Sequence, residues 1–378
     1  MHIAFLTPEY PHERTGRYGG IGTSIKNAAE GLVVLGEKVS VFVVSQQENA
    51  VLQDNGITIH LIKQRKYKWF SWFFYKKYVQ NYINNQVKLE NIDVVEAPDW
   101  SGISAFMNFD CPLVVRFNGS DAYFCELEGR SQKRKNFWLE KIALRGADRF
   151  ISVSEFTSDR TREIFKLKKK IEIIPNSIAS DKFLPRPEMG LENRLLYFGT
   201  IIRKKGVLDL AEIFNKIIEK SPQSSLFFAG SDVKDLKTGK STQKLVEQLL
   251  SPQAREHVHF LGILDYENVQ NEIAKATVIV LPSHAEALPM TWLEAMAMEK
   301  ALVTSNIGWA QEVMINGKTG FTVDPKSHQE YAEKTLQLLD DKNLRNAVGH
   351  EARVHVVNHF SAAKIAERNQ QFYKQLCK

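Results

Sequence analysis

The sequence has few cysteines and no segment suited to crossing a membrane. Its three cysteines, Cys111, Cys125 and Cys377, form no C-x-x-C pair, so neither a zinc site nor a disulfide framework is expected. A reducing cytoplasm fits this pattern. No run of about 18 apolar residues is present, which argues against a transmembrane helix. Pro8 interrupts the N-terminal segment too early for a signal peptide, and we interpret that segment as a first strand.

The charge balance gives no reason to expect a nucleic-acid partner. The 50 Lys and Arg residues, against 44 Asp and Glu residues, give a net charge of +6. Such a mild excess permits an anionic substrate or an anionic membrane surface without requiring nucleic acid. No zinc-finger or RNP-type motif is present. The hydrophobic content of 43% and the charged content of 25% are typical of a soluble globular protein.

Short apolar runs alternate with segments of helical spacing in both halves of the chain. This alternation predicts an α/β fold with doubly wound parallel sheets covered on both faces, and ligands at the carboxyl ends of the strands. Ser180–Asn193 has two prolines, one glycine and no periodicity, so we interpret it as a linker between two such domains facing a cleft. The expected strands are Ile3–Leu6, Val39–Val44, Ile57–Ile62, Val94–Val95, Leu113–Phe117, Phe150–Val153, Ile171–Ile174, Leu195–Phe198, Leu226–Ala229, Val258–Leu261, Val278–Leu281, Leu302–Thr304 and Phe321–Val323.

Two carboxylates, eight residues apart, flank a predicted strand-to-helix turn in the second half. Glu286 follows the apolar run Thr277–Leu281, and Glu294 falls in the first turn of a helix expected to start near Thr291. Carboxylates accept hydrogen bonds from sugar hydroxyls. A glutamate in a first helical turn is also stabilised by the helix dipole alone, so the alternative is a purely structural role.

The elbow before that helix, Leu288-Pro289-Met290, supplies the complementary chemistry. Backbone N–H groups at a helix N-terminus have no partner within the helix and favour an anion, typically phosphate. Acceptors for sugar hydroxyls beside donors for phosphate suit a nucleotide sugar.

A basic turn, residues 199–206, follows another predicted strand and precedes the helix Val207–Ile218. It contains no acid, and Arg203 and Lys205 are placed to neutralise a diphosphate, the arginine by bidentate bonds. The alternative is a solvated basic turn.

A glycine-rich loop, residues 16–22, follows the first strand and leads into a helix. Gly19 and Gly20 would let the backbone approach a ligand closely, with phosphate favoured at the helix N-terminus. A dinucleotide-binding loop is the weaker alternative, because Gly22 is followed by Ile25 where a third glycine is required, and the second strand ends without an acid.

Polar residues after the strand Leu113–Phe117 belong to the expected ligand edge of the first domain. Asn118 and Asp121 are therefore expected to face the cleft and to bind the acceptor, with Asp121 orienting its hydroxyl. The alternative role for Asp121 is to cap the turn that follows.

The segment Lys63–Tyr78 is unusual in composition, with six basic and eight aromatic residues. A mixed cationic and aromatic helix suits the surface of an anionic bilayer. The alternative is an internal helix whose lysine stems cover apolar surface. A second basic run, Arg130–Lys135, is interpreted as a solvated loop.

The segment around the two glutamates strongly resembles the donor site of retaining GT-B glycosyltransferases of the family 4 type, and the resemblance extends over nearly the whole chain. The resemblance implies that Glu294 binds the ribose, Glu286 the transferred sugar, and the Gly19-Gly20 loop the donor diphosphate and acceptor. It also implies a last helix crossing back to the first domain, which gives predicted domains 1–180, 181–360 and 361–378. The matching residues are Ser283, Glu286, Leu288-Pro289, Leu293–Ala297, Ala301–Val303, Glu312 and Gly317–Phe321.

Several positions depart from the resembled pattern. Similar enzymes usually carry histidine where this chain has Asn118, and arginine where it has Thr200, so Arg203 would take over the latter role. Ala287 and Glu299 stand where relatives often have glycine. Two alternatives therefore stay open: a nucleotide-sugar epimerase on the same scaffold, and a non-catalytic subunit that binds donor or glycan.

We interpret the chain as a retaining, hexosyltransferase-like enzyme that moves a sugar from a nucleoside diphosphate donor, expected to be a UDP-sugar, to an acceptor hydroxyl. No D-x-D motif occurs, so no metal and no cofactor is expected. The expected acceptor is a glycan or a lipid-linked molecule in cell-surface polysaccharide or glycolipid assembly. The expected location is the cytoplasm, at the inner face of the membrane through Lys63–Tyr78.

Overall fold

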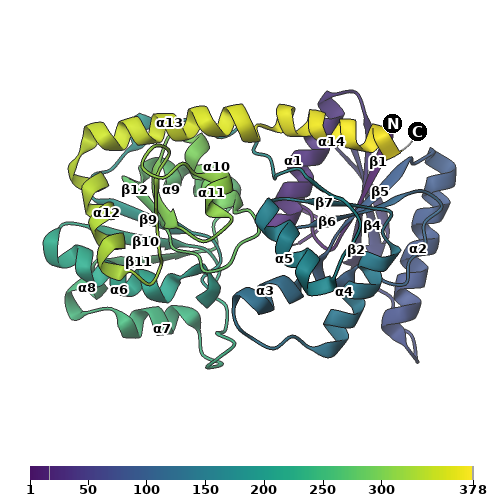
Figure 1. Cartoon of the computed structure of the whole chain (residues 1–378), viewed down its shortest axis with the longest axis horizontal. Helices are drawn as coiled ribbons and strands as arrows, with labels where there is room; N and C mark the ends of the chain where they lie inside the picture. The colour runs from purple at the N-terminus through teal and green to yellow at the C-terminus, as the bar shows by residue number, and fades with distance from the viewer. Residues whose placement is uncertain (17, 377–378) are drawn as a thin grey trace. The chain divides into compact units, whose positions relative to one another are not determined.

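The computed structural model describes residues 1–16 and 18–376, which form two compact units (Figure 1). Unit 1 comprises Met1–Ile178 and Phe360–Lys378, and unit 2 comprises Ala179–His359. The sequence analysis placed the corresponding boundaries after residues 180 and 360. No helix among the described residues is long and apolar enough to cross a membrane.

Unit 1 is built on an eight-stranded sheet in the order β3-β4-β2-β1-β5-β6-β7-β8. All neighbouring strands are parallel except β3 and β4. The antiparallel edge strand β3 was not predicted, because its sequence AVLQD alternates half-buried and exposed positions and has no continuous apolar run. The strands are β1 (His2–Thr7), β2 (Lys38–Gln46), β3 (Ala50–Asp54), β4 (Ile57–Lys63), β5 (Val94–Pro98), β6 (Leu113–Phe117), β7 (Arg149–Ser152) and β8 (Ile171–Ile173).

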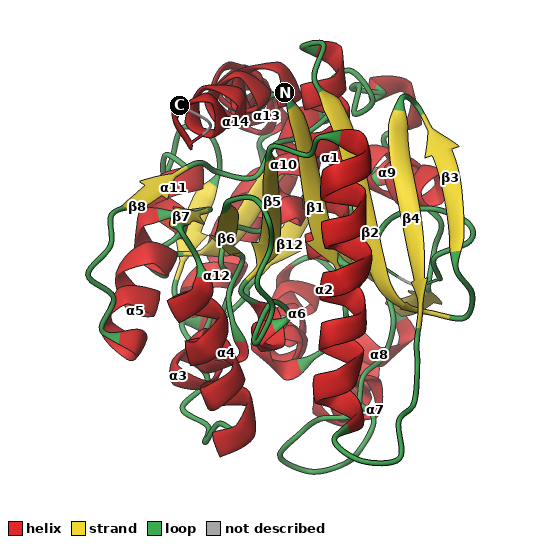
Figure 2. Ribbon diagram, turned by 90° about the vertical axis from the view of Figure 1, so that its right-hand side faces the viewer, coloured by secondary structure: helices red, strands yellow, loops and turns green. Residues whose placement is uncertain are grey.

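Helices cover both faces of this sheet, and α2 lies in front of the strands in Figure 2. Alternate strand residues enter two separate cores: Ile3 and Phe5 pack with α1 and α14, and Ala4 and Leu6 pack with α2. A Cβ on Gly31 would lie 2.8 Å from the Cβ of Ala366, so glycine permits the close approach of α1 and α14. The elements are α1 (Gly20–Val34), α2 (Ser71–Glu90), η1 (Trp100–Gly102), α3 (Asp121–Leu127), α4 (Arg134–Gly146), α5 (Glu155–Phe165) and α14 (Ala362–Leu376).

Unit 2 contains a six-stranded, all-parallel sheet in the order β11-β10-β9-β12-β13-β14. The central strand β12 is buried throughout, as expected for a parallel strand covered on both sides. The strands are β9 (Arg194–Phe198), β10 (Ser225–Ala229), β11 (Val258–Gly262), β12 (Val278–Leu281), β13 (Ala301–Ser305) and β14 (Phe321–Val323).

The helices of unit 2 follow the predicted βα alternation, and α6 buries one apolar stripe with helical spacing: Val207, Leu210, Ala211, Phe214 and Ile218. The elements are η2 (Pro187–Met189), η3 (Arg203–Lys205), α6 (Val207–Lys220), α7 (Thr242–Leu249), α8 (Pro252–Glu256), α9 (Tyr266–Lys275), α10 (Met290–Ala297), α11 (Ala310–Val313), α12 (His328–Asp340) and α13 (Lys342–Phe360).

The predicted fold class, two doubly wound parallel α/β domains, is confirmed. One local prediction is wrong. Helix α10 begins at Met290, in agreement with the start expected near Thr291, but its first turn contains no acidic residue, contrary to the placement of Glu294 there. Glu294 therefore lies in the second turn, where the helix dipole that we invoked for its structural alternative is weaker.

Candidate active site

Two loops of unit 2 are fastened together at the carboxyl ends of β9 and β12. Gly206 has a φ of +70°, and a Cβ there would lie 1.8 Å from the carbonyl oxygen of Pro282. The carbonyl oxygen of Lys204 accepts a hydrogen bond from the N–H of His284 at 2.8 Å. Only glycine can occupy position 206 under both constraints, so the basic turn is held directly against the loop that carries Glu286.

This contact brings two of the predicted residues together. The Lys205 ammonium donates to Oε1 of Glu286, and Ser283 Oγ donates to the same oxygen at 2.8 Å. Glu286 is only 7% exposed. A buried carboxylate paired with a cation is fixed in orientation as well as in charge, so its position is set before any ligand arrives.

Glu294 lies in a different environment, although it is equally buried at 7% exposure. Burial raises the pKa of its carboxyl to about 7, and the positive charge of Lys205 opposes that shift. Within residues 1–16 and 18–376 this carboxyl makes no hydrogen bond and no ion pair. Because the side chain keeps 7% of its surface exposed, a ligand from outside the chain can reach the carboxyl and supply the missing hydrogen bonds.

The N-terminus of α10 is not capped by a side chain. Its N-cap residue is Pro289, flanked by the buried side chains of Leu288 and Met290. Because the first turn also lacks an acidic residue, its N–H groups and the positive end of the helix dipole suit an anion.

Arg203 is placed differently from Lys205. Its Nε and Nη2 donate to the two carboxylate oxygens of Asp235 at 2.7 and 3.0 Å. The hydrogen bond from Arg203 is the main reason why the pKa of Asp235 lies well below its ordinary value. The structure thus pairs Lys205 with Glu286, whereas the Arg203 guanidinium is paired with a different carboxylate, that of Asp235.

Three residues that the sequence analysis did not select brace the same loop. Nε2 of His284 lies 2.7 Å from Oδ2 of Asp209, and Nε2 of His328 lies 3.0 Å from Oδ1. Burial alone would raise the pKa of Asp209, but its bonds to the two histidines lower it. No sequence pattern links positions 209, 284 and 328. Among the residues that the structure describes, no group of three His, Cys, Asp or Glu side chains could hold a metal ion.

In unit 1 the two predicted glycines lie at the start of α1. Gly19 is the extended residue before the helix and Gly20 is its first residue. A Cβ on Gly20 would meet nothing within 4 Å, so packing in unit 1 does not require glycine there. Oε1 of Glu9, which the sequence analysis did not consider, accepts the N–H of Gly22 at 2.9 Å. A carboxylate of the chain itself thus lies at the helix end that was predicted to face phosphate.

Asn118 follows β6, and its position is set by a buried acid. The N–H of Asn118 donates to Oδ1 of Asp99 at 3.0 Å. Burial raises the pKa of the Asp99 carboxyl to about 8. The side-chain amide of Asn118, which carries no charge, therefore extends from a loop whose backbone is held by Asp99.

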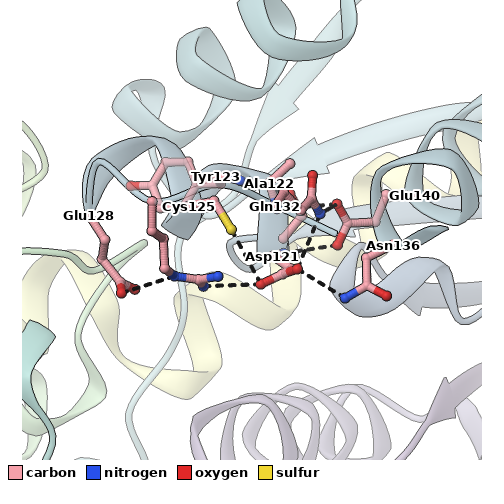
Figure 3. A network of polar contacts seen from close by, with 10 residues as sticks. Asp121, Ala122, Tyr123, Cys125, Glu128, Gln132, Asn136 and Glu140 are labelled. Carbon is pink, nitrogen blue, oxygen red and sulfur yellow. Dashed lines mark hydrogen bonds and ion pairs between the residues drawn. The ribbon is translucent and has the colours of Figure 1, made fainter. Parts of the chain in front are cut away.

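Asp121 is the first residue of α3, and Figure 3 shows its carboxylate surrounded by donors. Arg130 Nη2, Asn136 Nδ2 and Gln132 Nε2 donate to it at 3.0, 3.1 and 3.3 Å. Burial would raise the pKa of Asp121, but these bonds lower it. The alternative in which Asp121 caps the following turn is wrong, because the N-cap is Ser120, whose Oγ accepts from the N–H of Tyr123.

Glu140 of α4 completes this arrangement and was not predicted. Its carboxylate accepts the N–H groups of Asp121 and Ala122 at 2.9 and 3.2 Å. Burial raises the pKa of Glu140, although these hydrogen bonds oppose the shift. In the sequence Glu140 is one charge among several on a helix, and its burial depends on a loop 18 residues away.

Both halves of the chain are similar to known glycosyltransferases. Residues 18–182 match the model of Glycosyltransferase Family 4, and residues 185–355 match that of Glycosyl transferases group 1. A glycogen synthase of Mycobacterium tuberculosis is 28% identical over 296 residues, covering 74% of this chain and 68% of that protein. An uncharacterised glycosyltransferase of Methanocaldococcus jannaschii is 25% identical over 394 residues, covering 99% and 98%.

Solved structures share the fold over the full length. Sucrose-phosphate synthase of Thermosynechococcus elongatus superposes with a TM-score of 0.81 at 20% identity, covering 99% of this chain and 98% of that one. HepE of Anabaena, in complex with UDP, gives 0.74 at 17% identity, with both chains fully covered. With two family models spanning most of its length and a matching fold, the chain belongs to the GT-B glycosyltransferases of the family 4 type.

Proposed function

We propose that this glycosyltransferase is a retaining hexosyltransferase that uses a UDP-sugar as donor. The observation that carries the proposal is Glu294: a buried carboxyl with no hydrogen bond in the described part of the chain, beside a helix N-terminus without a side-chain cap. Ribose hydroxyls would satisfy the carboxyl, and the N–H groups of α10 would receive phosphate. The HepE structures, which contain UDP or UDP-glucose, support the choice of uracil as the nucleobase of the donor.

Lys205 and Glu286 are assigned to the reacting end of the donor. As the glycosidic bond breaks, negative charge develops on the departing diphosphate, and a preorganised ammonium stabilises it. Glu286 would accept hydrogen bonds from the transferred sugar while its bond with Lys205 fixes both groups. Arg203 remains a prediction for the diphosphate, with its present partner Asp235 as a competitor.

The anomeric configuration of the sugar would be retained if the acceptor hydroxyl attacks the anomeric carbon from the face that the diphosphate leaves. The departing phosphate would then take the proton of that hydroxyl. In this mechanism no protein group acts as general base, and Lys205 with the α10 N-terminus supplies the charge stabilisation that a metal would otherwise give. The Gly19-Gly20 loop, Asn118 and Asp121 are assigned to the diphosphate and the acceptor.

The acceptor is proposed to be a glycan or a lipid-linked molecule of cell-surface polysaccharide or glycolipid assembly. A capsular polysaccharide biosynthesis glycosyltransferase of Staphylococcus aureus is among the relatives, at 28% identity over 257 residues. The cytoplasmic enzyme would reach such an acceptor by contact of Lys63–Tyr78 with an anionic membrane surface, and the exposed rings of Trp69 and Phe70 support that contact.

Thermal unfolding with UDP, GDP and ADP, each with EDTA, tests the donor assignment on the wild type and Glu294→Ala. A rise in unfolding temperature with UDP alone, lost in the variant, is expected. A rise in unfolding temperature with GDP or ADP instead would mean that the donor carries that nucleotide. No rise with any of the three would contradict the proposal. Incubation with donor but no acceptor separates the epimerase alternative, which would convert the sugar of the donor.

A further inference from the structure

The aromatic residues at the start of α2 continue across the surface of unit 1 onto α4. The ring centroids of Phe73 and Phe106 lie 5.6 Å apart, and those of Phe106 and Trp138 lie 5.2 Å apart. Trp72 also packs on Phe106, at 5.6 Å. These contacts join two helices that start more than sixty residues apart in the sequence into one aromatic surface.

The outer rings of this surface are exposed to an unusual extent. Trp69 is 71% exposed, Phe70 70%, Trp138 50% and Phe74 46%. Phe70 also has a φ of +47°, which is a costly conformation for a bulky residue. Contiguous exposed apolar side chains mark interaction sites, and a strained backbone that projects one of them outward is a second sign of function.

The charges around these rings are of one sign. Residues 63–78 and 129–139 contain ten Lys and Arg side chains between them and no Asp or Glu. Lys135 Nζ lies 5.4 Å from the ring centroid of Trp72, and Lys77 Nζ lies 5.9 Å from that of Phe73. Exposed aromatic side chains surrounded by cationic ones complement a bilayer surface, which presents anionic headgroups above an apolar layer.

We propose that the first turns of α2 and α4, the residues just before them and Phe106 form a single docking surface for an anionic bilayer. We name it the α2–α4 patch: Lys66, Lys68, Trp69, Phe70, Trp72, Phe73, Phe74, Phe106, Lys133, Arg134, Lys135 and Trp138. This inference rests on the membrane contact proposed above and extends it. Residues 130–135, interpreted from the sequence as a solvated loop, become part of the contact, and Trp138 becomes its second anchor.

The patch is joined to the proposed acceptor loop through α4. Asn136 donates to the Asp121 carboxylate at 3.1 Å, and Glu140 holds the N–H of Asp121. These residues alternate along α4 with Lys135 and Trp138 of the patch. The N-terminal ends of α2 and α4 lie on the same side of unit 1 in Figure 2. A docked bilayer would therefore hold a lipid-linked acceptor at the edge of the sheet that carries Asn118 and Asp121.

Co-sedimentation of the full chain with vesicles tests the patch. The vesicles contain phosphatidylcholine alone or with about a third phosphatidylglycerol, at low and at physiological salt. Wild type should bind the anionic vesicles only. Trp69→Ser/Phe70→Ser and Trp138→Ser should each weaken partitioning at least roughly five-fold. Lys133→Glu/Lys135→Glu should weaken it at least roughly 25-fold, because each basic side chain near an anionic surface is worth roughly five-fold.

Matched controls are available in the same unit. Leu89→Ser removes a side chain that is 75% exposed at the other end of α2, and Lys168→Glu/Lys170→Glu reverses two exposed charges next to β8. Both should bind as the wild type does. The charge-reversal variant of α4 alters only exposed residues, so it keeps the test valid if Trp138→Ser folds poorly.

The outcomes separate the two levels of the proposal. Full binding by both α4 variants with loss in the α2 variant would overturn the α2–α4 patch and leave the Lys63–Tyr78 contact standing. No binding of wild type to anionic vesicles at low salt, or equal binding to neutral vesicles, would overturn both. The UDP-induced thermal shift of the same preparations reports on the donor site alone and distinguishes these failures from failure of the donor assignment.

Discussion

The proposed donor loop of unit 2 (residues 282–289) and the proposed acceptor loop of unit 1 (residues 118–121) both follow parallel strands but are held differently. In unit 2, backbone contacts between Gly206 and Pro282 fix the loops, and the buried carboxyl of Glu294 is left without a hydrogen bond in the described chain. In unit 1, side chains fix the loop: Asp121 accepts from several donors, and Glu140 holds two backbone N–H groups.

This difference shows which carboxylates the fold itself uses. A buried acid that is fully hydrogen-bonded, such as Glu140, is accounted for by the loop that it orders. Glu294, whose pKa is raised to about 7 and which makes no hydrogen bond within the described residues, is instead available to the ligand proposed above.

The largest effect is expected from Gly206→Ala, which disrupts the close backbone contact between Gly206 and Pro282 in unit 2 (the backbone lock). The new Cβ would overlap the Pro282 carbonyl at 1.8 Å and adopt a left-handed conformation, for a loss of about 2–5 kcal/mol in unfolding free energy and loss of nucleotide binding. Gly239→Ala is the control: it has a φ of +71° and no neighbour within 4 Å, and should cost about 1–2 kcal/mol. If urea unfolding gave equal losses of unfolding free energy for Gly206→Ala and Gly239→Ala, the contact between Gly206 and Pro282 would not be what requires glycine at position 206.

Glu294→Gln separates ligand chemistry from stability. Because the pKa of Glu294 is about 7 in the folded state against an ordinary 4.5, folding favours the protonated form, so stability falls as pH rises from about 4.5 to about 7. Glutamine cannot ionise, and the variant should be more stable than wild type at pH 8 by about 3 kcal/mol while binding UDP more weakly.

Unfolding temperatures from pH 5 to 9 measure the first effect and UDP titration the second. At pH 5 the difference in stability between the two proteins should shrink to about 1 kcal/mol. A variant that binds UDP as well as wild type does would remove Glu294 from the ribose site.

The same contrast explains what could be read from the sequence. The parallel sheets and the linker follow from local pattern, as does the choice of Glu286 and Lys205 as residues close to strand ends. The pairing of Lys205 with Glu286, 81 residues away, was not predicted. Glu140, Asp99 and the His284–Asp209–His328 cluster were missed, because each depends on contacts between segments 18 to 119 residues apart that no period or motif connects. Both loops contain such contacts: Asp99 and Glu140 hold residues 118–122 in unit 1, and Asp209 holds His284 in unit 2.

Glu140→Gln tests the side-chain lock of unit 1 and should have a smaller effect. The amide nitrogen cannot accept the N–H of Ala122 or Asp121, which leaves one helix donor unpaired at a cost of about 1–3 kcal/mol. The Michaelis constant for the acceptor should rise while the UDP-induced thermal shift is unchanged. Glu163→Gln, at an exposed site on α5, is the control and should change neither quantity. A weaker UDP shift would mean that the two loops are not independent.

Arg203→Lys carries the smallest expected effect and decides between the two partners of that arginine. Lysine cannot reproduce the two bonds to Asp235, but the guanidinium is more than a third exposed, so the loss of stability should stay at or below about 1 kcal/mol. If Asp235 is the permanent partner of Arg203, UDP affinity should remain within about two-fold of wild type, because the cation at the diphosphate is then Lys205 alone. Isothermal titration with UDP gives this comparison directly, with Lys205→Gln as the variant expected to lose affinity. A loss in Arg203→Lys as large as in Lys205→Gln would mean that Arg203 leaves Asp235 for the donor.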